Sequence, residues 1–129
     1  MTPLILALLL VSQTGEPDCA GTQAEMTQCA ANDFARADDE LNAVWRAVMA
    51  ALRNRDVETA QYDTASRGSY TEAARNAQRA WVAFRDAECG AESDNEARGG
   101  SMAPMVFHAC RARLTEERTA QLRAAYLDR

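Results

Sequence analysis

The sequence contains no lysine and a single histidine, His108, so arginine supplies nearly all of its positive charge. Fourteen arginines stand against 19 aspartates and glutamates, which gives a formal net charge of −5 at pH 7. A protein that binds nucleic acid needs a basic surface to meet the phosphates, so this deficit of positive charge disfavours that class. The excess of carboxylates favours a cationic partner instead.

Apolar runs long enough to cross a membrane are also missing. The run from Leu4 to Val11 is uncharged but too short to span a bilayer as a helix. It suits the apolar part of a signal peptide, although no Lys or Arg precedes it and no Ala-x-Ala site follows it. We therefore expect residues 1–15 to be a signal peptide and residues 16–129 to form one domain that is periplasmic or secreted. The alternative is a buried N-terminal helix.

No stretch alternates between apolar and polar residues for long enough to predict a strand. Apolar residues recur instead at three- and four-residue steps in three segments, at about 22–53, 70–89 and 104–127. Thr22 and Glu25 match a capping box at the start of the first segment. The pattern predicts an all-α fold, a small bundle of three main helices around one core.

The second of these segments contains the motif 78-QRAWVAFRDAEC-89. Large aromatic side chains at helical spacing are more often core residues than site residues, so we expect Trp81 and Phe84 to be buried. Arg85 follows Trp81 by one turn and is expected to pair with a carboxylate of the first helix, with Glu25 the first choice. The alternative is a solvated arginine that lies over the indole ring.

Four cysteines in a small exported chain indicate two disulfides, whereas four reduced thiols would suit a cytosolic protein. If the first two helices are antiparallel and the second ends at Cys89, all four cysteines gather at one end and staple the bundle there. Matching depths along the helices then favour Cys19–Cys89 and Cys29–Cys110, and the other connectivities stay open. Cys19–Cys29 is the least favoured, because a helix from Thr22 would hold these Cα atoms beyond the limit of about 7 Å.

The segment after Cys89, GAESDNEARGGS, is polar and rich in glycine, and it predicts a loop. Glu88, Glu92, Asp94 and Glu96 lie at or within this loop, and no basic residue occurs between Glu88 and Glu96. These four carboxylates form the candidate partner-binding edge. The alternative is an acidic loop that is simply solvated.

Residue combinations that would indicate catalysis or metal binding are missing. His108 and Cys110 are two positions apart and face different sides of a helix, so they form no nucleophile–base pair. The consecutive carboxylates from Asp38 to Glu40 also point in different directions, unlike the pair of a glycosidase. The C-x-x-C spacing of zinc sites, the central glycine of an EF-hand loop and the phosphate-binding fingerprints are absent. We expect no enzymatic activity, no metal and no cofactor.

Several short motifs follow one another in a definite order along most of the chain, each occurring once. They are Cys19-x-x-Thr22-x-x-Glu25-Met26-x-x-Cys29, Ala37-Asp38-x-x-Leu41-Asn42, Gln78-x-x-Trp81-x-x-Phe84-Arg85-Asp86-x-x-Cys89, Gly99-Gly100-Ser101, Cys110 and Leu114-Thr115-x-x-Arg118-x-x-x-Leu122. With them the sequence resembles the LprI-like lysozyme-inhibitor N-terminal domain family, whose members are small exported helical proteins. The resemblance implies that Glu25, Gln78, Trp81, Phe84, Arg85, Asp86 and Arg118 form a structural motif.

The resemblance also implies inhibition of lysozyme, which is the activity of at least one member of the family. We therefore expect an exported, non-enzymatic binding protein whose acidic surface meets a cationic partner, with lysozyme the leading candidate. The alternative is an envelope scaffold or accessory module that binds another protein and has no effect on lysozyme.

Overall fold

The structure is a computed structural model that describes residues 15–62 and 68–128. The predicted signal peptide, apart from its last residue, lies outside the described residues. Three helices make up the described fold: α1 (Gln23–Thr59), α2 (Tyr70–Ala97) and α3 (Ala103–Tyr126). No strand occurs in residues 15–62 or 68–128. The prediction of a small all-α bundle of three main helices is confirmed.

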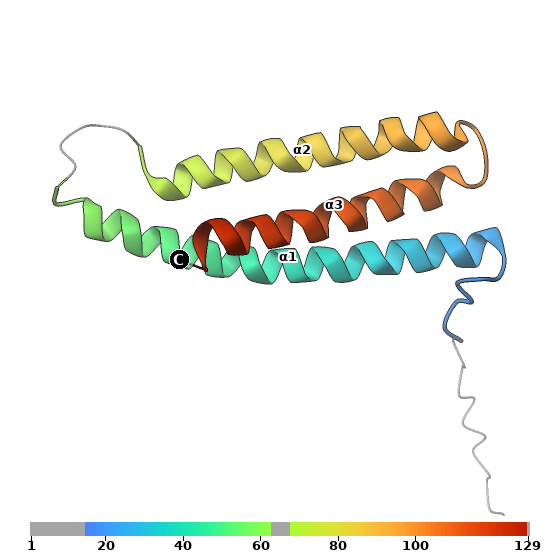
Figure 1. Cartoon of the computed structure of the whole chain (residues 1–129), viewed down its shortest axis with the longest axis horizontal. Helices are drawn as coiled ribbons and strands as arrows, with labels where there is room; N and C mark the ends of the chain where they lie inside the picture. The colour runs from blue at the N-terminus through green and yellow to red at the C-terminus, as the bar shows by residue number, and fades with distance from the viewer. Residues whose placement is uncertain (1–14, 63–67, 129) are drawn as a thin grey trace, which may run out of the picture.

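The helices α1 and α3 run in the same direction, and α2 runs antiparallel to both (Figure 1). The start of α1, the end of α2 and the start of α3 lie together at one end of the molecule, and α3 stops partway along α1 (Figure 1). α3 packs against both other helices, whereas the direct interface between α1 and α2 is the smallest of the three. The third helix therefore holds the bundle together.

The hydrophobic core follows the apolar stripe of α1. Its buried cluster consists of Leu41, Val44, Val48, Leu52, Ala74 and Leu122. Four of these residues repeat at three- and four-residue steps along α1, which places them on one helical face toward the other helices. Trp45 and Trp81 are partly buried and pack against this cluster. The cluster is thus built mainly by α1, while α2 adds Ala74 and α3 adds Leu122.

The first helix begins with the predicted capping box, which is confirmed. Thr22 Oγ1 accepts a hydrogen bond from the backbone N–H of Glu25 at 3.3 Å, and the Glu25 carboxylate accepts one from the backbone N–H of Thr22 at 2.8 Å. The backbone and hydroxyl donors of Thr22 hold the pKa of Glu25 below its usual value. The carboxylate of Glu25 is therefore committed to the start of its own helix.

The second helix begins with a cap that α1 helps to form. Ser69 Oγ accepts a hydrogen bond from the backbone N–H of Glu72 at 3.0 Å. Asp56 of α1 accepts bonds from the N–H groups of Tyr70 at 2.7 Å and Thr71 at 3.2 Å, and also from the Thr71 hydroxyl. These donors, the Thr71 hydroxyl above all, lower the pKa of Asp56. One carboxylate therefore fastens the end of α1 to the start of α2.

The end of α2 differs from the prediction, because the helix passes Cys89 and continues to Ala97. The prediction of a loop after Cys89 is therefore wrong for most of the residues it covered. A single glycine inside a helix costs only about 1 kcal/mol relative to alanine, so Gly90 does not stop it. The chain turns instead at Gly99, whose φ of 72° is in the left-handed region that favours glycine.

The disulfides join Cys19 to Cys29 and Cys89 to Cys110, so both predicted pairings are wrong. Cys89 lies about two turns before the end of α2, and Cys110 lies about two turns after the start of α3. Equal depth on the two sides of the α2–α3 hairpin brings their Cα atoms to 5.5 Å. The prediction used the same matching of depths, but it ended α2 too early.

The pairing of Cys19 with Cys29 has a local cause. The N–H of Gly21 donates to the carbonyl oxygen of Asp18 at 2.9 Å, and this turn folds the chain back along the start of α1. The short segment from Cys19 to the helix can span about 10 Å, which matches the rise of the helix up to Cys29. The Cα atoms come to 5.7 Å as a result. Cys19–Cys29 lies at the start of α1, and Cys89–Cys110 joins the last turns of α2 to the first turns of α3. These helix ends lie together at one end of the bundle (Figure 1), so the predicted staple at one end is confirmed.

Candidate functional site

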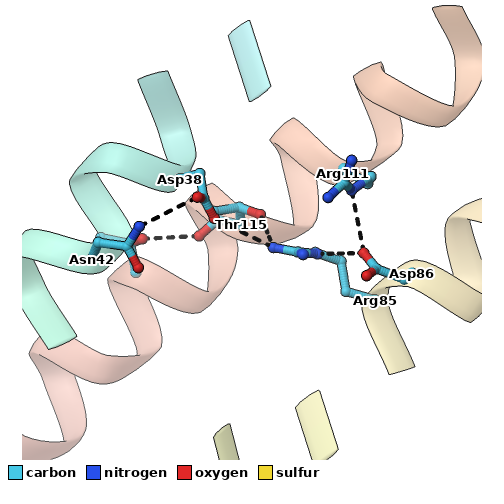
Figure 2. Close-up of polar contacts among 7 residues, drawn as sticks. Asp38, Asn42, Arg85, Asp86, Arg111 and Thr115 are labelled. Carbon is cyan, nitrogen blue, oxygen red and sulfur yellow. Dashed lines mark hydrogen bonds and ion pairs between the residues drawn. The ribbon is translucent and has the colours of Figure 1, made fainter. Parts of the chain in front are cut away.

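A buried arginine, Arg85 of α2, lies where the three helices meet, and only 4% of its surface is exposed. Its Nε donates to Asp86 Oδ1 at 3.0 Å, and its Nη1 donates to Thr115 Oγ1 of α3 at 3.3 Å. The same Nη1 forms an ion pair with Asp38 Oδ1 of α1 at 3.7 Å (Figure 2). Asp38 in turn accepts a hydrogen bond from Asn42 at 3.3 Å. We call this group the arginine junction.

The predicted pairing of Arg85 with Glu25 is wrong. That prediction placed Arg85 about one turn from the end of α2, level with the first turn of α1. Because α2 continues to Ala97, Arg85 lies about two turns deeper, opposite Asp38. A buried charge requires a partner with good geometry, and Asp38 and Asp86 together satisfy that requirement.

A second arginine extends the junction on the side of α3. Arg111 Nε lies 3.2 Å from Asp86 Oδ1, but its N–H is not directed at the oxygen, so the contact is an ion pair without a hydrogen bond. The ring of Phe34 faces both guanidinium groups, at 3.7 Å from Arg111 and 5.2 Å from Arg85. Aromatic faces attract cations at these distances. Asp86 and Phe34 thus lie between two arginines from different helices.

The remaining residues of the motif form a contact between α2 and α3. Arg118 Nε donates to Gln78 Oε1 at 3.0 Å, and its guanidinium lies 5.7 Å from the ring of Trp81. The guanidinium of Arg85 lies 5.2 Å from the same ring. Burial lowers the pKa of Arg118, which still remains a cation at neutral pH. The indole therefore packs against the core and also meets two guanidinium groups.

Phe84 does not belong to the core, and the prediction for it is wrong. The side chain is 55% exposed. The buried face of α2 follows Trp81 in steps of four, through Arg85, Cys89 and Ser93, and Phe84 lies about 100° away from that line. Tyr70 and Ala77, two other residues of α2, are exposed as well. The sequence did contain a sign of the buried face of α2, namely the series Trp81, Arg85, Cys89 and Ser93 at four-residue steps. The arginine within this series argued against its burial.

The predicted acidic edge lies on a helix rather than on a loop. Glu88, Glu92 and Glu96 follow one another at four-residue steps near the end of α2 and share one face, which we call the acidic stripe. Glu92 is half-buried and pairs with Arg113 of α3 at 2.9 Å. Asp94 lies on another face and pairs with Arg98 at 3.3 Å. The structure therefore brings three of the four predicted residues together.

Apart from Glu72 in its first turn, most charges of α2 run against its helix dipole. Arg75 and Arg79 occupy its first half, the acidic stripe its last turns, and its last turn contains no basic residue. The carboxyl end of a helix carries partial negative charge, so carboxylates there destabilise it by a few tenths of a kcal/mol or more each. Helix stability therefore does not explain this arrangement of charge.

The described residues offer little for catalysis. All four cysteines are bonded in disulfides, so no thiol is left beside His108. Burial, and then the charge of Arg111, lower the pKa of His108, which is neutral at pH 7. Residues 15–62 and 68–128 contain no group of three or more His, Cys, Asp or Glu placed to hold a metal. No helix in this part of the chain is long and apolar enough to span a membrane.

The fold and the junction define a small all-α protein with disulfides at one end and a buried arginine between its helices. The family model described as "Lysozyme inhibitor LprI" matches residues 15–122, and the chain belongs to this family. An uncharacterized protein of Rhizobium meliloti (strain 1021) is 45% identical over 114 residues, which are 87% of this chain and 81% of that protein.

A solved structure has the same fold. It is a crystal structure of a DUF1311 family protein from Pseudomonas putida KT2440, with a TM-score of 0.66 and 22% sequence identity. The likeness covers 87% of this chain and all of that one. At this identity the comparison supports the fold alone.

Proposed function

We propose that this protein is an exported, non-enzymatic binding protein that inhibits lysozyme, a cationic enzyme, through the acidic stripe of α2. Its membership of a family described as lysozyme inhibitors supports the choice of partner. Two disulfides are typical of an oxidising compartment, which supports a periplasmic or secreted location. The net charge of −5 supports attraction to a cationic surface.

The observation that carries this proposal is the placement of the stripe on a rigid helix. Glu88, Glu92 and Glu96 extend over about 12 Å along α2. The Cys89–Cys110 disulfide ties the same turns of α2 to α3, so the carboxylates are held in place before binding. A preorganised surface loses less entropy on association than a mobile loop. The acidic loop predicted from the sequence would have lost more entropy on binding than this helix does.

Phe84 adds an apolar contact to the same surface. It lies one turn before Glu88 in the same four-residue series and is 55% exposed. Aromatic residues at the centre of an interface often contribute most of its binding energy, while charges at the rim govern the association rate and its dependence on salt. We propose that Phe84 anchors the contact and that the acidic stripe attracts and orients the cationic partner.

The experiment is a muramidase turnover assay with the purified, oxidised protein, over a salt series. The test variant is E88Q/E92Q/E96Q, and the matched control is D39N/E58Q/E116Q, which removes three exposed carboxylates elsewhere. We expect the test variant to weaken inhibition at low salt by at least about tenfold and to flatten the salt dependence. The control should stay within about twofold of the wild type.

Two outcomes would contradict the proposal. Equal losses in both variants would mean that net charge matters and the stripe does not. An inactive wild-type protein would remove lysozyme as the partner. Loss of the Glu92–Arg113 ion pair does not confuse the result, because exposed or half-buried pairs contribute about 1 kcal/mol or less to folding.

A second candidate function is that of an envelope accessory module that binds another protein. It is favoured by exposed apolar side chains near the end of α1 and the start of α2, away from the disulfides. Val57 is 76% exposed, Tyr62 80% and Tyr70 42%. Clustered apolar residues on a surface often mark a protein interface. V57S/Y62S/Y70S should leave any lysozyme inhibition unchanged, because this second function involves a partner other than lysozyme. A loss of inhibition would mean that lysozyme itself contacts these residues and would contradict the second function.

A further inference from the structure

An open groove of about 400 Å³ lies between α1 and α2, in the half of the bundle that the acidic stripe does not reach. It is lined by Trp45, Arg75, Gln78, Arg79 and Val82. The groove exists because the direct contact between α1 and α2 is the smallest of the three helix interfaces. Its volume is within the range of sites that bind small molecules.

One wall of this groove is apolar and firmly supported. Trp45 packs against the buried core cluster, so its ring position is set by α1 and not by the ligand. Val82 of α2 is half-buried opposite it. An indole face beside an aliphatic side chain suits a flat or apolar group, which would lose contact with water there.

The rim of the groove is cationic. Arg75 and Arg79 are one turn apart on α2, both are exposed, and neither forms an ion pair within residues 15–62 and 68–128. Some other arginines of this acidic chain, such as Arg98 and Arg123, have carboxylate partners. Like charges at four-residue spacing destabilise a helix by a few tenths of a kcal/mol, which an anion between them would relieve. Arginine forks suit carboxylate and phosphate oxygens.

Gln78 provides donors at the same place. Its Oε1 accepts a hydrogen bond from Arg118 Nε at 3.0 Å, which orients the amide group. Both N–H donors of that amide then stay available, since no acceptor for them occurs among the described residues. The groove therefore offers one apolar wall, two guanidinium groups and one oriented amide.

We infer that this groove binds a small amphipathic organic anion. Its carboxylate or phosphate group lies between Arg75 and Arg79 and accepts a hydrogen bond from Gln78, and its apolar part covers Trp45 and Val82. This ligand is opposite in charge to the cationic partner proposed for the acidic stripe. The inference therefore stands independently of the lysozyme proposal, and its test uses no lysozyme.

The test follows the indole N–H signals of the oxidised protein by nuclear magnetic resonance. The chain has two tryptophans, so Trp45→Phe assigns both signals and Trp81 serves as the internal reference. The probes are naphthalene-2-carboxylate, 2-naphthyl phosphate and the uncharged naphthalene-2-methanol. We expect the two anions to shift the signal of Trp45 in a saturable way and the alcohol to bind at least about tenfold more weakly. The stronger of the two anions identifies the preferred acid group.

A charge variant completes the test. R75Q/R79Q should weaken the binding of both anions by at least about tenfold. The matched control R53Q/R98Q should bind them with an affinity within about twofold of that of the wild type. Equal binding of the alcohol and the anions would overturn the inference, and so would an unshifted Trp45 signal at millimolar probe. Equal weakening in both double variants would overturn it as well, because it would indicate attraction to net charge alone.

Discussion

Replacing Arg85 with methionine tests the arginine junction most directly. The methionine keeps most of the aliphatic volume and removes the guanidinium. The charge-assisted hydrogen bond to Asp86, worth about 1.5–3 kcal/mol, is lost. So are the ring contacts with Phe34 and Trp81, at about 0.5–1 kcal/mol each. These losses alone would destabilise the fold by about 2.5–5 kcal/mol.

Two effects reduce that figure. The folded state no longer pays the desolvation of a buried cation, which amounts to several kcal/mol. The carboxylates left behind also have water, because the side chains of Asp38 and Asp86 are 39% and 45% exposed, and Asp86 keeps Arg111. We therefore expect Arg85→Met to destabilise the protein by about 2 kcal/mol, below the roughly 3–5 kcal/mol of a buried charge left without its partner.

The assay is urea unfolding of the oxidised protein, followed by far-ultraviolet circular dichroism. A lower midpoint with an unchanged slope reports a loss of stability rather than a change in the unfolded state. Arg98→Met is the control, because Arg98 forms an exposed pair with Asp94 and should cost less than about 0.5 kcal/mol. If Arg85→Met were equally mild, the junction would not stabilise the fold and our reasoning would be wrong.

A double variant separates the hydrogen bond to Thr115 from the ion pairs. Thr115 is fully buried, so the loss of Arg85 removes a partner from its hydroxyl. Removing both partners of a buried hydrogen bond costs less than removing one, because no unsatisfied group remains. Thr115→Val should therefore destabilise the Arg85→Met variant less than it destabilises the wild type. Equal effects in the two backgrounds would mean that the two residues are not coupled.

Three further predictions concern the staples, the aromatic residues and the dependence on pH. Peptide mapping without reduction should recover Cys19–Cys29 and Cys89–Cys110, and C89S/C110S should cost about 3 kcal/mol by the loop-entropy relation, more than C19S/C29S with its shorter loop. Trp81→Ala should cost about 2–3 kcal/mol, because the ring is only partly buried, while Phe84→Ala should stay below about 1 kcal/mol; similar losses would contradict the assigned face of α2. The pKa of Asp56 is lower in the folded state than the ordinary aspartate value of 3.8, so the contribution of Asp56 to stability is complete above that value and is lost as pH falls through and below it. Unfolding midpoints between pH 6 and pH 3 should therefore fall less steeply for Asp56→Asn than for the wild type, and parallel curves would contradict this role.

What could be predicted from the sequence was set by interactions within one or two helical turns. The stripe of α1 predicted its buried face, and Thr22 with Glu25 predicted its first residue, because each signal depends only on neighbours along the same helix. The even number of cysteines predicted two disulfides, and the order of the helices predicted that both would lie at one end.

The tertiary structure decided everything that depends on the offset between helices. A local glycine suggested that α2 ends near Cys89, but packing against α3 compensates that small cost and carries the helix to Ala97. Because the prediction ended α2 at Cys89, it placed every residue of α2 about two turns too close to the end of the bundle. It led to the wrong partner for Cys89 and to Glu25 instead of Asp38 as the partner of Arg85.

The same offset determines where the functional surfaces lie. The sequence by itself determined that Glu88, Glu92 and Glu96 are close together and acidic, and that Arg75 and Arg79 form a basic turn earlier in the same helix. Only the tertiary structure made the carboxylates a stripe on a helix fastened to α3, and only it placed the two arginines beside Trp45 of α1. The physical reason is that local propensity acts over a few residues, whereas the register between helices is fixed by side chains that meet across the whole bundle.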